Sequence, residues 1–165
     1  MAINVRQATL DDAAAIAAVL NGVIAEGNLT IFETPFSTEA EKRFIGALGP
    51  RSALHVAEND GDILGVQSVD QLSAVSRSVD HVATIGTWLR SDARGRGIGR
   101  MLFDESVAFA GLKGYTKIVI QVLAANERAL RFYRRLGFVD IGVARKHVRL
   151  SDVFHDEIYL EKLLD

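Results

Sequence analysis

Apolar residues recur at helical spacing in four parts of the chain. Ile16, Leu20 and Val23 fall on one face of a helix that is expected to start after the cap residue Thr9 and to run to about residue 25. Three further helices are predicted at 38–48, 97–112 and 126–137. The second of these four helices is expected to open with Thr38 and Glu41, which have the spacing of a capping box.

Alternating or continuous apolar runs predict seven strands around these helices. They are expected at 3–8, 53–58, 63–69, 81–89, 116–123, 138–148 and 154–164. The tetrapeptide NDGD at 59–62 predicts a hairpin. The strongly apolar run TKIVIQVL at 116–123 is typical of a strand in the middle of a sheet covered on both faces. The order of the elements predicts a mixed α/β sheet rather than a repeated βαβ barrel.

Composition narrows the classes of function. With 165 residues, 48% of them hydrophobic, the chain can build one domain with a core and is short for two. A formal net charge of -2 argues against non-specific binding to nucleic acids. The lack of cysteine excludes disulfides, thiolate nucleophiles and cysteine-based metal centres. No stretch resembles a membrane span or a signal peptide, so we expect a cytoplasmic protein without a membrane or nucleic-acid partner.

One short stretch, RSDARGRGIGRML at 90–102, lies between a predicted strand and a predicted helix. Its glycines at 95, 97 and 99 let the backbone approach a ligand closely, at the positive end of the helix dipole. Such a place suits a phosphate or pyrophosphate, and three arginines can add charge-assisted hydrogen bonds: Arg94, Arg96 and Arg100. The spacing is neither that of a Rossmann fingerprint nor that of a P-loop. Glycine and arginine content alone is equally compatible with a solubilising turn.

The spacing Arg94-x-x-Gly97-x-Gly99 matches the R/Q-x-x-G-x-G/A signature of the GNAT superfamily of N-acetyltransferases, which the chain resembles. NERALRFYRRLGF at 126–138 resembles a second segment of that family, N-x-x-A-x-x-F-Y-x-x-x-G-F. The resemblance covers essentially the whole chain and is closest in layout to the bacterial phosphinothricin and amino-acid acetyltransferases. It implies one domain over residues 1–165 with an α/β (α+β) fold, in which about seven strands form a mixed, mostly antiparallel sheet flanked by four helices.

The resemblance implies acetyl-CoA as a cosubstrate, and no metal. Backbone N–H groups of one loop would bind its pyrophosphate: Arg94, Gly95, Arg96, Gly97, Ile98, Gly99 and Arg100. Its pantetheine arm would pair with the strand end Thr87, Trp88 and Leu89, and would accept a hydrogen bond from Asn126, which also caps a helix. An N–H near Leu89 would polarise the thioester carbonyl, and the Tyr133 hydroxyl would protonate the departing thiolate.

The family also implies where the amine acceptor binds. The connector 30–36 and the turn between the last two strands would form a pocket with apolar walls and one carboxylate that attracts an ammonium group: Ile31, Phe32, Phe36 and Phe154, with Glu33. Many members carry a glutamate on the fourth strand, whereas the sequence at 83–85 is ATI. His81 and Glu33 are therefore the leading candidates for the catalytic base. Asp80, His155 and Asp156 are further candidates.

These features predict an acetyl-CoA-dependent N-acetyltransferase in which a small primary amine, an amino acid or a similar molecule, attacks the thioester directly. Two alternatives remain open at this stage. One is an acetyltransferase of protein or peptide N-termini. The other is a non-catalytic acyl-CoA sensor, for which the missing glutamate is the only support. The family further implies a homodimer.

Overall fold

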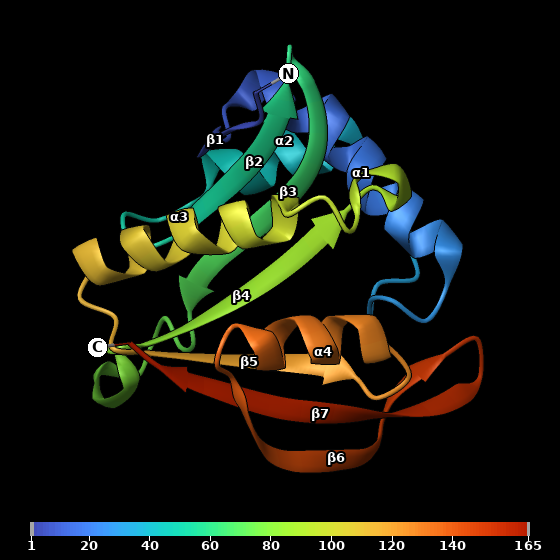
Figure 1. Ribbon diagram of the computed structural model, residues 1–165, viewed down its shortest axis with the longest axis vertical. Helices are drawn as coiled ribbons and strands as arrows, with labels where there is room; N and C mark the ends of the chain where they lie inside the picture. The colour runs from blue at the N-terminus through green and yellow to red at the C-terminus, as the bar shows by residue number, and fades with distance from the viewer. Residues whose placement is uncertain (1, 165) are drawn as a thin grey trace.

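The computed structural model describes residues 2–164, which form a seven-stranded sheet with helices on both faces (Figure 1). The helices are α1 (Ala13–Glu26), α2 (Thr38–Gly46), α3 (Ile98–Leu112) and α4 (Glu127–Arg135). The strands are β1 (Asn4–Gln7), β2 (Ala53–Asn59), β3 (Asp62–Gln71), β4 (Val82–Leu89), β5 (Lys117–Leu123), β6 (Val139–Leu150) and β7 (Val153–Leu163). Their order is β1-β2-β3-β4-β5-β7-β6, and the pair β4–β5 is parallel whereas the others are antiparallel. The predicted mixed, mostly antiparallel fold is confirmed.

Both hairpins of the sheet turn through two residues with positive φ. Asp60 and Gly61 join β2 to β3 with φ of 50° and 84°, which confirms the hairpin predicted from NDGD. Ser151 and Asp152 join β6 to β7 with φ of 45° and 66°. This second turn contains no glycine, and it lies at the turn predicted between the last two strands.

The predicted starts of α1 and α2 are wrong in detail. Thr9 precedes a short 3-10 turn, so that α1 begins only at Ala13. Helix α2 is capped by Ser37, whose hydroxyl accepts a hydrogen bond from the Ala40 N–H at 3.1 Å. Thr38 is therefore the first helical residue, and the expected capping box with Glu41 does not form. Either hydroxyl can cap a helix, and the pattern could not decide between neighbours.

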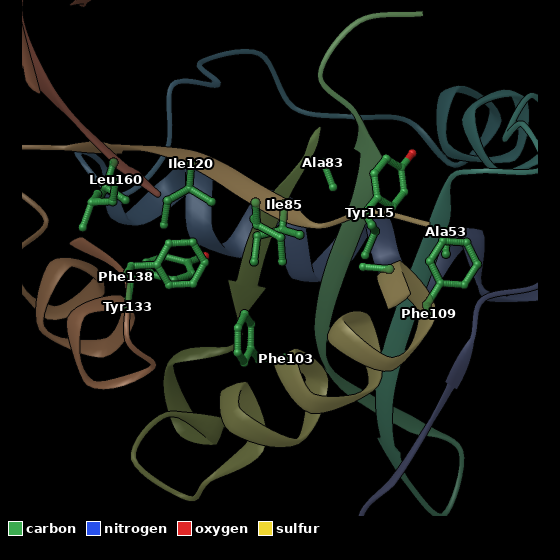
Figure 2. Packing of buried hydrophobic residues seen from close by; sticks show 14 of the residues in the cluster. Ala53, Ala83, Ile85, Phe103, Phe109, Tyr115, Ile120, Tyr133, Phe138 and Leu160 are labelled. Carbon is green, nitrogen blue, oxygen red and sulfur yellow. The ribbon is translucent and has the colours of Figure 1, made fainter. Parts of the chain in front are cut away.

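The two helical layers cover different parts of the sheet. Helices α3 and α4 enclose the larger core, in which aromatic rings from both helices pack with aliphatic side chains of the strands (Figure 2). Helix α1 packs against β3 and β4 on the opposite face. It does not extend over β5, where Gln121 is exposed. The expectation that β5 is covered on both faces is therefore wrong. No helix within residues 2–164 is long and apolar enough to cross a membrane.

Strands β4 and β5 part soon after they meet. Their pairing joins Val82–Thr84 to Lys117–Val119 and stops there, and the two strands then diverge (Figure 1). Helix α4 lies over β5 on one face, and the segment after α1 approaches the hairpin β6–β7 on the other. The sheet is therefore split at the end of β4, directly before the glycine–arginine loop.

An ion-pair network fastens β1 to the start of α1. Arg6 donates to both oxygens of Asp12 at 2.7 and 2.9 Å and to Glu58 on β2 at 2.9 Å. Asp12 also accepts the Thr9 N–H at 2.7 Å. These hydrogen bonds, chiefly that from Arg6, lower the pKa of Asp12 to about 2, against the opposing effect of burial.

The depressed pKa of Asp12 makes the stability of the fold depend on pH. Its contribution is complete above the ordinary carboxyl pKa of 3.8 and is lost as the pH falls toward 2. We expect Asp12→Asn to lower the free energy of unfolding by about 1–2 kcal/mol at pH 7, with the difference shrinking between pH 4 and pH 2. Urea unfolding across this range measures it, with Asp11→Asn at an exposed neighbouring carboxyl as control. A loss of equal size at every pH would contradict this account.

Candidate active site

The loop after β4 ends at the N-terminus of α3, a helix of 15 residues. Gly95 and Gly97 have φ of 74° and 81°, in the left-handed region that favours glycine. A Cβ added to either residue would meet no atom within 4 Å, so their backbones border open space. Open backbone at the positive end of a helix dipole is the arrangement that binds anions.

Two other residues take part in packing: Ile98 through its side chain, and Gly99 because it has none. A Cβ on Gly99 would lie 3.1 Å from a ring carbon of Phe132, so the absence of a side chain lets α4 pack closely against α3. The Ile98 side chain is buried in the core. What either residue can offer a ligand is its backbone N–H. The expected close approach of a ligand to Gly99 stays a prediction.

The arginines of the loop differ in their availability. Arg94 donates to the Leu89 carbonyl from Nε and Nη2, at 3.2 and 2.9 Å, and pairs through two hydrogen bonds with Glu26 at the end of α1. This pairing lowers the pKa of Glu26. The Arg94 guanidinium therefore ties the loop to β4 and α1. Arg96 and Arg100 are exposed, Arg100 beside Asp104 at 2.7 Å, and these two side chains can reach an anion.

Tyr133 extends from α4 to the place where β4 leaves β5. Its hydroxyl lies 2.7 Å from the Thr87 Oγ1, and its ring packs edge-on against Phe138. The side chain is buried, and burial raises the pKa of Tyr133 to about 12, although the hydrogen bond with Thr87 acts in the opposite direction. At neutral pH the phenol carries its proton and can donate it.

Asn126 has the capping role that the sequence predicted. Its Oδ1 accepts the Ala129 N–H at 3.2 Å, at the start of α4. Its Nδ2 donates to the Leu29 carbonyl at 3.3 Å. The same amide thus joins α4 to the segment that follows α1, next to the split in the sheet. The expected hydrogen bond to a pantetheine arm stays a prediction.

A cavity of about 350 Å³ lies between the end of α1, its following segment and the hairpin β6–β7. Its lining is mostly apolar with several polar groups: Ile24, Gly27, Asn28, Thr30, Phe32, Glu33, Leu150, Ser151, Val153 and His155. Glu33 joins the two walls, because its Oε1 accepts the Ser151 N–H at 2.6 Å. The cavity occupies the place predicted for the amine acceptor.

Only part of the predicted acceptor set lines this cavity. Phe32 and Glu33 do, whereas Ile31 does not and Phe36 packs edge-on against the Phe32 ring instead. Phe154 is 58% exposed on the other face of β7, and its neighbours Val153 and His155 point into the cavity. Successive residues of a strand face opposite sides, so choosing the largest aromatic selected the wrong face.

An aromatic stack connects the cavity with the split sheet. The Phe32 ring lies parallel to the Trp88 indole, with centroids 6.0 Å apart. The indole in turn covers Gly86, where a Cβ would come within 2.3 Å of it. Trp88 and Thr87 are neighbours on β4 whose side chains face opposite sides. The aromatic wall of the cavity is therefore next to the strand end that carries the hydrogen bond to Tyr133.

The structure does not bring His81 into this site. His81 precedes β4, and six residues of extended chain, about 20 Å, separate it from Thr87. Asp80 lies beside it and is paired with Arg51. Asp156 accepts the Lys146 N–H at 2.7 Å within the hairpin β6–β7. Of the base candidates named from the sequence, Glu33 and His155 remain at the cavity.

The sequence did not single out two buried polar residues, Glu157 and Gln67. Glu157 is buried two residues beyond His155 on the same face of β7, where burial raises its pKa and His147 lies 3.9 Å away. Gln67 is fully buried on β3 and donates to Thr87 Oγ1 at 2.7 Å. Gln67 lies between Val66 and Val69 in a buried, mostly apolar stretch of β3, and that interruption was the available signal. Among residues 2–164, no group of three or more His, Cys, Asp or Glu is placed to hold a metal ion.

An open glycine loop at a helix N-terminus, a split sheet and a buried tyrosine define an acyltransferase-type site. The model of the Acetyltransferase (GNAT) family matches residues 23–138, and the chain belongs to this family. It is an N-acetyltransferase, and the acyl donor of the family is acetyl-CoA.

Individual relatives agree with this assignment. The N-alpha-acetyltransferase RimI of Mycobacterium tuberculosis is 29% identical over 76% of this chain and 75% of its own length. An L-methionine sulfoximine/L-methionine sulfone acetyltransferase of Pseudomonas paraeruginosa is 24% identical over 98% and 96%. A phosphinothricin acetyltransferase of Sinorhizobium meliloti, solved with acetyl-CoA, has the same fold, with a TM-score of 0.89, 23% identity and coverage of 99% and 89%.

The conformation of Gly97 provides a test of the loop. We expect Gly97→Ala to destabilise the fold by about 1–2 kcal/mol, because the left-handed region is costly for a residue with a Cβ. Distortion of the loop should raise KM for acetyl-CoA by about fivefold, equivalent to about 1 kcal/mol, and change kcat less. Steady-state kinetics and thermal unfolding measure both effects. Gly111→Ala, in the same helix without a positive φ, is the matched control and should leave KM unchanged.

Proposed function

We propose that the protein transfers the acetyl group of acetyl-CoA to the amino group of a small acceptor of the amino-acid type. The observation that carries this acceptor class is the cavity of about 350 Å³, which is of the size that holds a small molecule. It is closed on two sides by the segment after α1 and by the hairpin β6–β7, which Glu33 and Ser151 join. A relative that matches 98% of the chain acts on an amino-acid derivative, which supports the same class.

The described residues fit acetyl-CoA on the opposite side of the split. Gly95 and Gly97 leave the space that a pyrophosphate needs, at the end of a helix dipole. Beyond Thr84, β4 runs on without pairing to β5, and an extended pantetheine arm can pair with backbone at the strand end Thr87–Leu89. Acetyl-CoA supplies the activated acyl group as a thioester.

Side chains of the protein would assist at the two atoms that exchange a proton, the amine nitrogen and the thioester sulfur. The amine nitrogen forms the new C–N bond as the C–S bond breaks, and the proton that nitrogen loses balances the one that sulfur gains. Tyr133 directs a protonated phenol toward the split and supplies the hydrogen bond to sulfur. A lysine-like amine is neutral in only about one molecule in a thousand at pH 7, so a base at the cavity is useful.

Glu157 is the base candidate that this proposal adds to Glu33 and His155. His155 lines the cavity, and Glu157 follows it on the same face of β7. Burial raises the pKa of Glu157 and so makes it a stronger base than an exposed carboxylate. One oxygen of Glu33 accepts two hydrogen bonds from Ser151, which suits Glu33 better to holding the cavity together and attracting an ammonium group.

Release of free thiol from acetyl-CoA tests the acceptor class. We expect release with amino acids and their sulfone or sulfoximine analogues, and little with polyamines, aminoglycosides or peptides with free N-termini. The chain contains no cysteine, so a thiol reagent reports only the product. Release with the peptides alone would favour the N-terminal acetyltransferase, which the RimI relative represents. Absence of release with every small amine would overturn the proposed acceptor class.

A homodimer is the second part of this proposal. Strand β6 is the edge of the sheet, and Val139, Ile141 and Val143 on it are at least half exposed. A long edge strand with exposed apolar side chains is a surface that pairs with another chain. Sedimentation equilibrium should give twice the chain mass of 18.0 kDa, and Val143→Lys should give the single mass. A native protein of one chain mass would refute the dimer. A cytoplasmic location stays a prediction of the sequence.

A further inference from the structure

A row of polar side chains crosses the buried face of the sheet beneath α3. His55, Gln67 and Thr87 are direct partners on β2, β3 and β4, so their side chains share one face. His55 and Gln67 are 1% and 0% exposed. The row begins at Ser106 on α3, whose Oγ lies 3.0 Å from His55 Nδ1, and it ends at Tyr133 on α4. It therefore spans the core from α3 to the split in the sheet.

The two hydrogen bonds that join Gln67, Thr87 and Tyr133 can run in only two directions. Gln67 Nε2 lies 2.7 Å from Thr87 Oγ1, and an amide nitrogen can only donate. Thr87 Oγ1 therefore accepts from Gln67, and its single hydrogen is left for the Tyr133 oxygen, 2.7 Å away. Tyr133 accepts this bond, so its own hydrogen points elsewhere. With the opposite amide orientation, Thr87 would donate to Gln67 and the Tyr133 hydrogen would be held by Thr87.

The far end of the row supports the same direction. Among residues 2–164, two buried atoms of cross-strand neighbours have no hydrogen-bond partner: Gln67 Oε1 and His55 Nε2. A neutral imidazole whose Nδ1 accepts from Ser106 carries its hydrogen on Nε2, on the strand next to the Gln67 oxygen, which can only accept. Burial lowers the pKa of His55 and keeps the ring neutral.

We propose that Gln67 is a positioning residue for acetyl transfer: its amide donates to Thr87, so that Thr87 donates to Tyr133 and leaves the Tyr133 hydrogen free for the leaving sulfur. The inference rests on the proposed role of Tyr133 as the proton donor. It explains why a fully buried amide stands in an apolar strand. Gln67 acts only through Thr87 and Tyr133.

A reversal of the row is the most direct test. Gln67→Glu keeps the shape of the side chain, but the ionised carboxylate can only accept, so Thr87 must donate to it and hold the Tyr133 hydrogen. While the introduced carboxyl is protonated it can still donate to Thr87. We therefore expect the ratio of native to variant kcat to rise from near one at low pH to about tenfold once this carboxyl ionises, a part of the effect of a general acid. A ratio that is constant with pH would overturn the proposal.

Two sets of variants separate positioning from folding. In a Tyr133→Phe background, Gln67→Glu should have no further effect on kcat, because the group it positions is gone; a full additional loss would overturn the proposal. Thr87→Val removes the hydroxyl that donates to Tyr133 and should lower kcat, and an unchanged kcat in Thr87→Val would also overturn the proposal. Val69→Ala, a buried apolar change on the same strand and face, is the control. It should lower stability without a pH-dependent ratio.

A spectroscopic measurement tests the direction of the hydrogen bond at Tyr133 without measuring turnover. The Raman Fermi doublet of a tyrosine distinguishes a phenol that accepts a hydrogen bond from one that donates it. The difference between the native protein and Tyr133→Phe isolates the Tyr133 signal. It should be of the accepting type in the native protein and should move toward the donating type in Gln67→Glu at high pH. No movement would overturn the row's direction, whereas unchanged kcat in Tyr133→Phe would instead refute the role of Tyr133 in transfer.

Discussion

Strands β4 and β5 pair over three residues and then separate. The other features of the site are arranged around the gap that this separation leaves. Backbone left unpaired inside a protein needs a partner or a cover. On one face α4 fills the wedge with Tyr133 and neighbouring rings. On the other face Trp88 folds over Gly86 and meets Phe32. Under the proposed function, this gap is the place where acetyl-CoA and the amine would meet.

The glycine–arginine loop carries less unpaired positive charge than its sequence suggests. Arg94 is neutralised by Glu26, and Arg100 lies beside Asp104. The proposed binding of a pyrophosphate would then depend mainly on oriented backbone N–H groups and the dipole of α3, with Arg96 and Arg100 at the rim. The ion pair of Arg94 has a different effect. Because Glu26 is the last residue of α1, the pair fixes the donor loop relative to the helix whose end borders the acceptor cavity.

Local patterns predicted most of the fold, and they also supplied the residues of the proposed donor half of the site. Glycine spacing, the Asn126 cap and the tyrosine of α4 are all encoded within a few residues, and the structure brings them together around the end of β4. The acceptor half depends on which face of β7 turns inward and on how two distant segments meet, as in the bond from Ser151 to Glu33. Such pairings are tertiary. For the same reason the sequence suggested His81 as a base, although it is remote from the end of β4. It did not suggest Gln67, which donates to Thr87.

The acceptor cavity is lined in part by connectors, the segment after α1 and the turn at Ser151, and in part by residues near the ends of α1, β6 and β7. The segment after α1 and the turn Ser151–Asp152 meet through one carboxylate and bear little of the core. Changes in their length or side chains can reshape the cavity without moving the end of β4 or the phenol on α4. New acceptor specificities can therefore evolve on this scaffold at low cost in stability. The transfer chemistry is inherited unchanged while the choice of amine diverges.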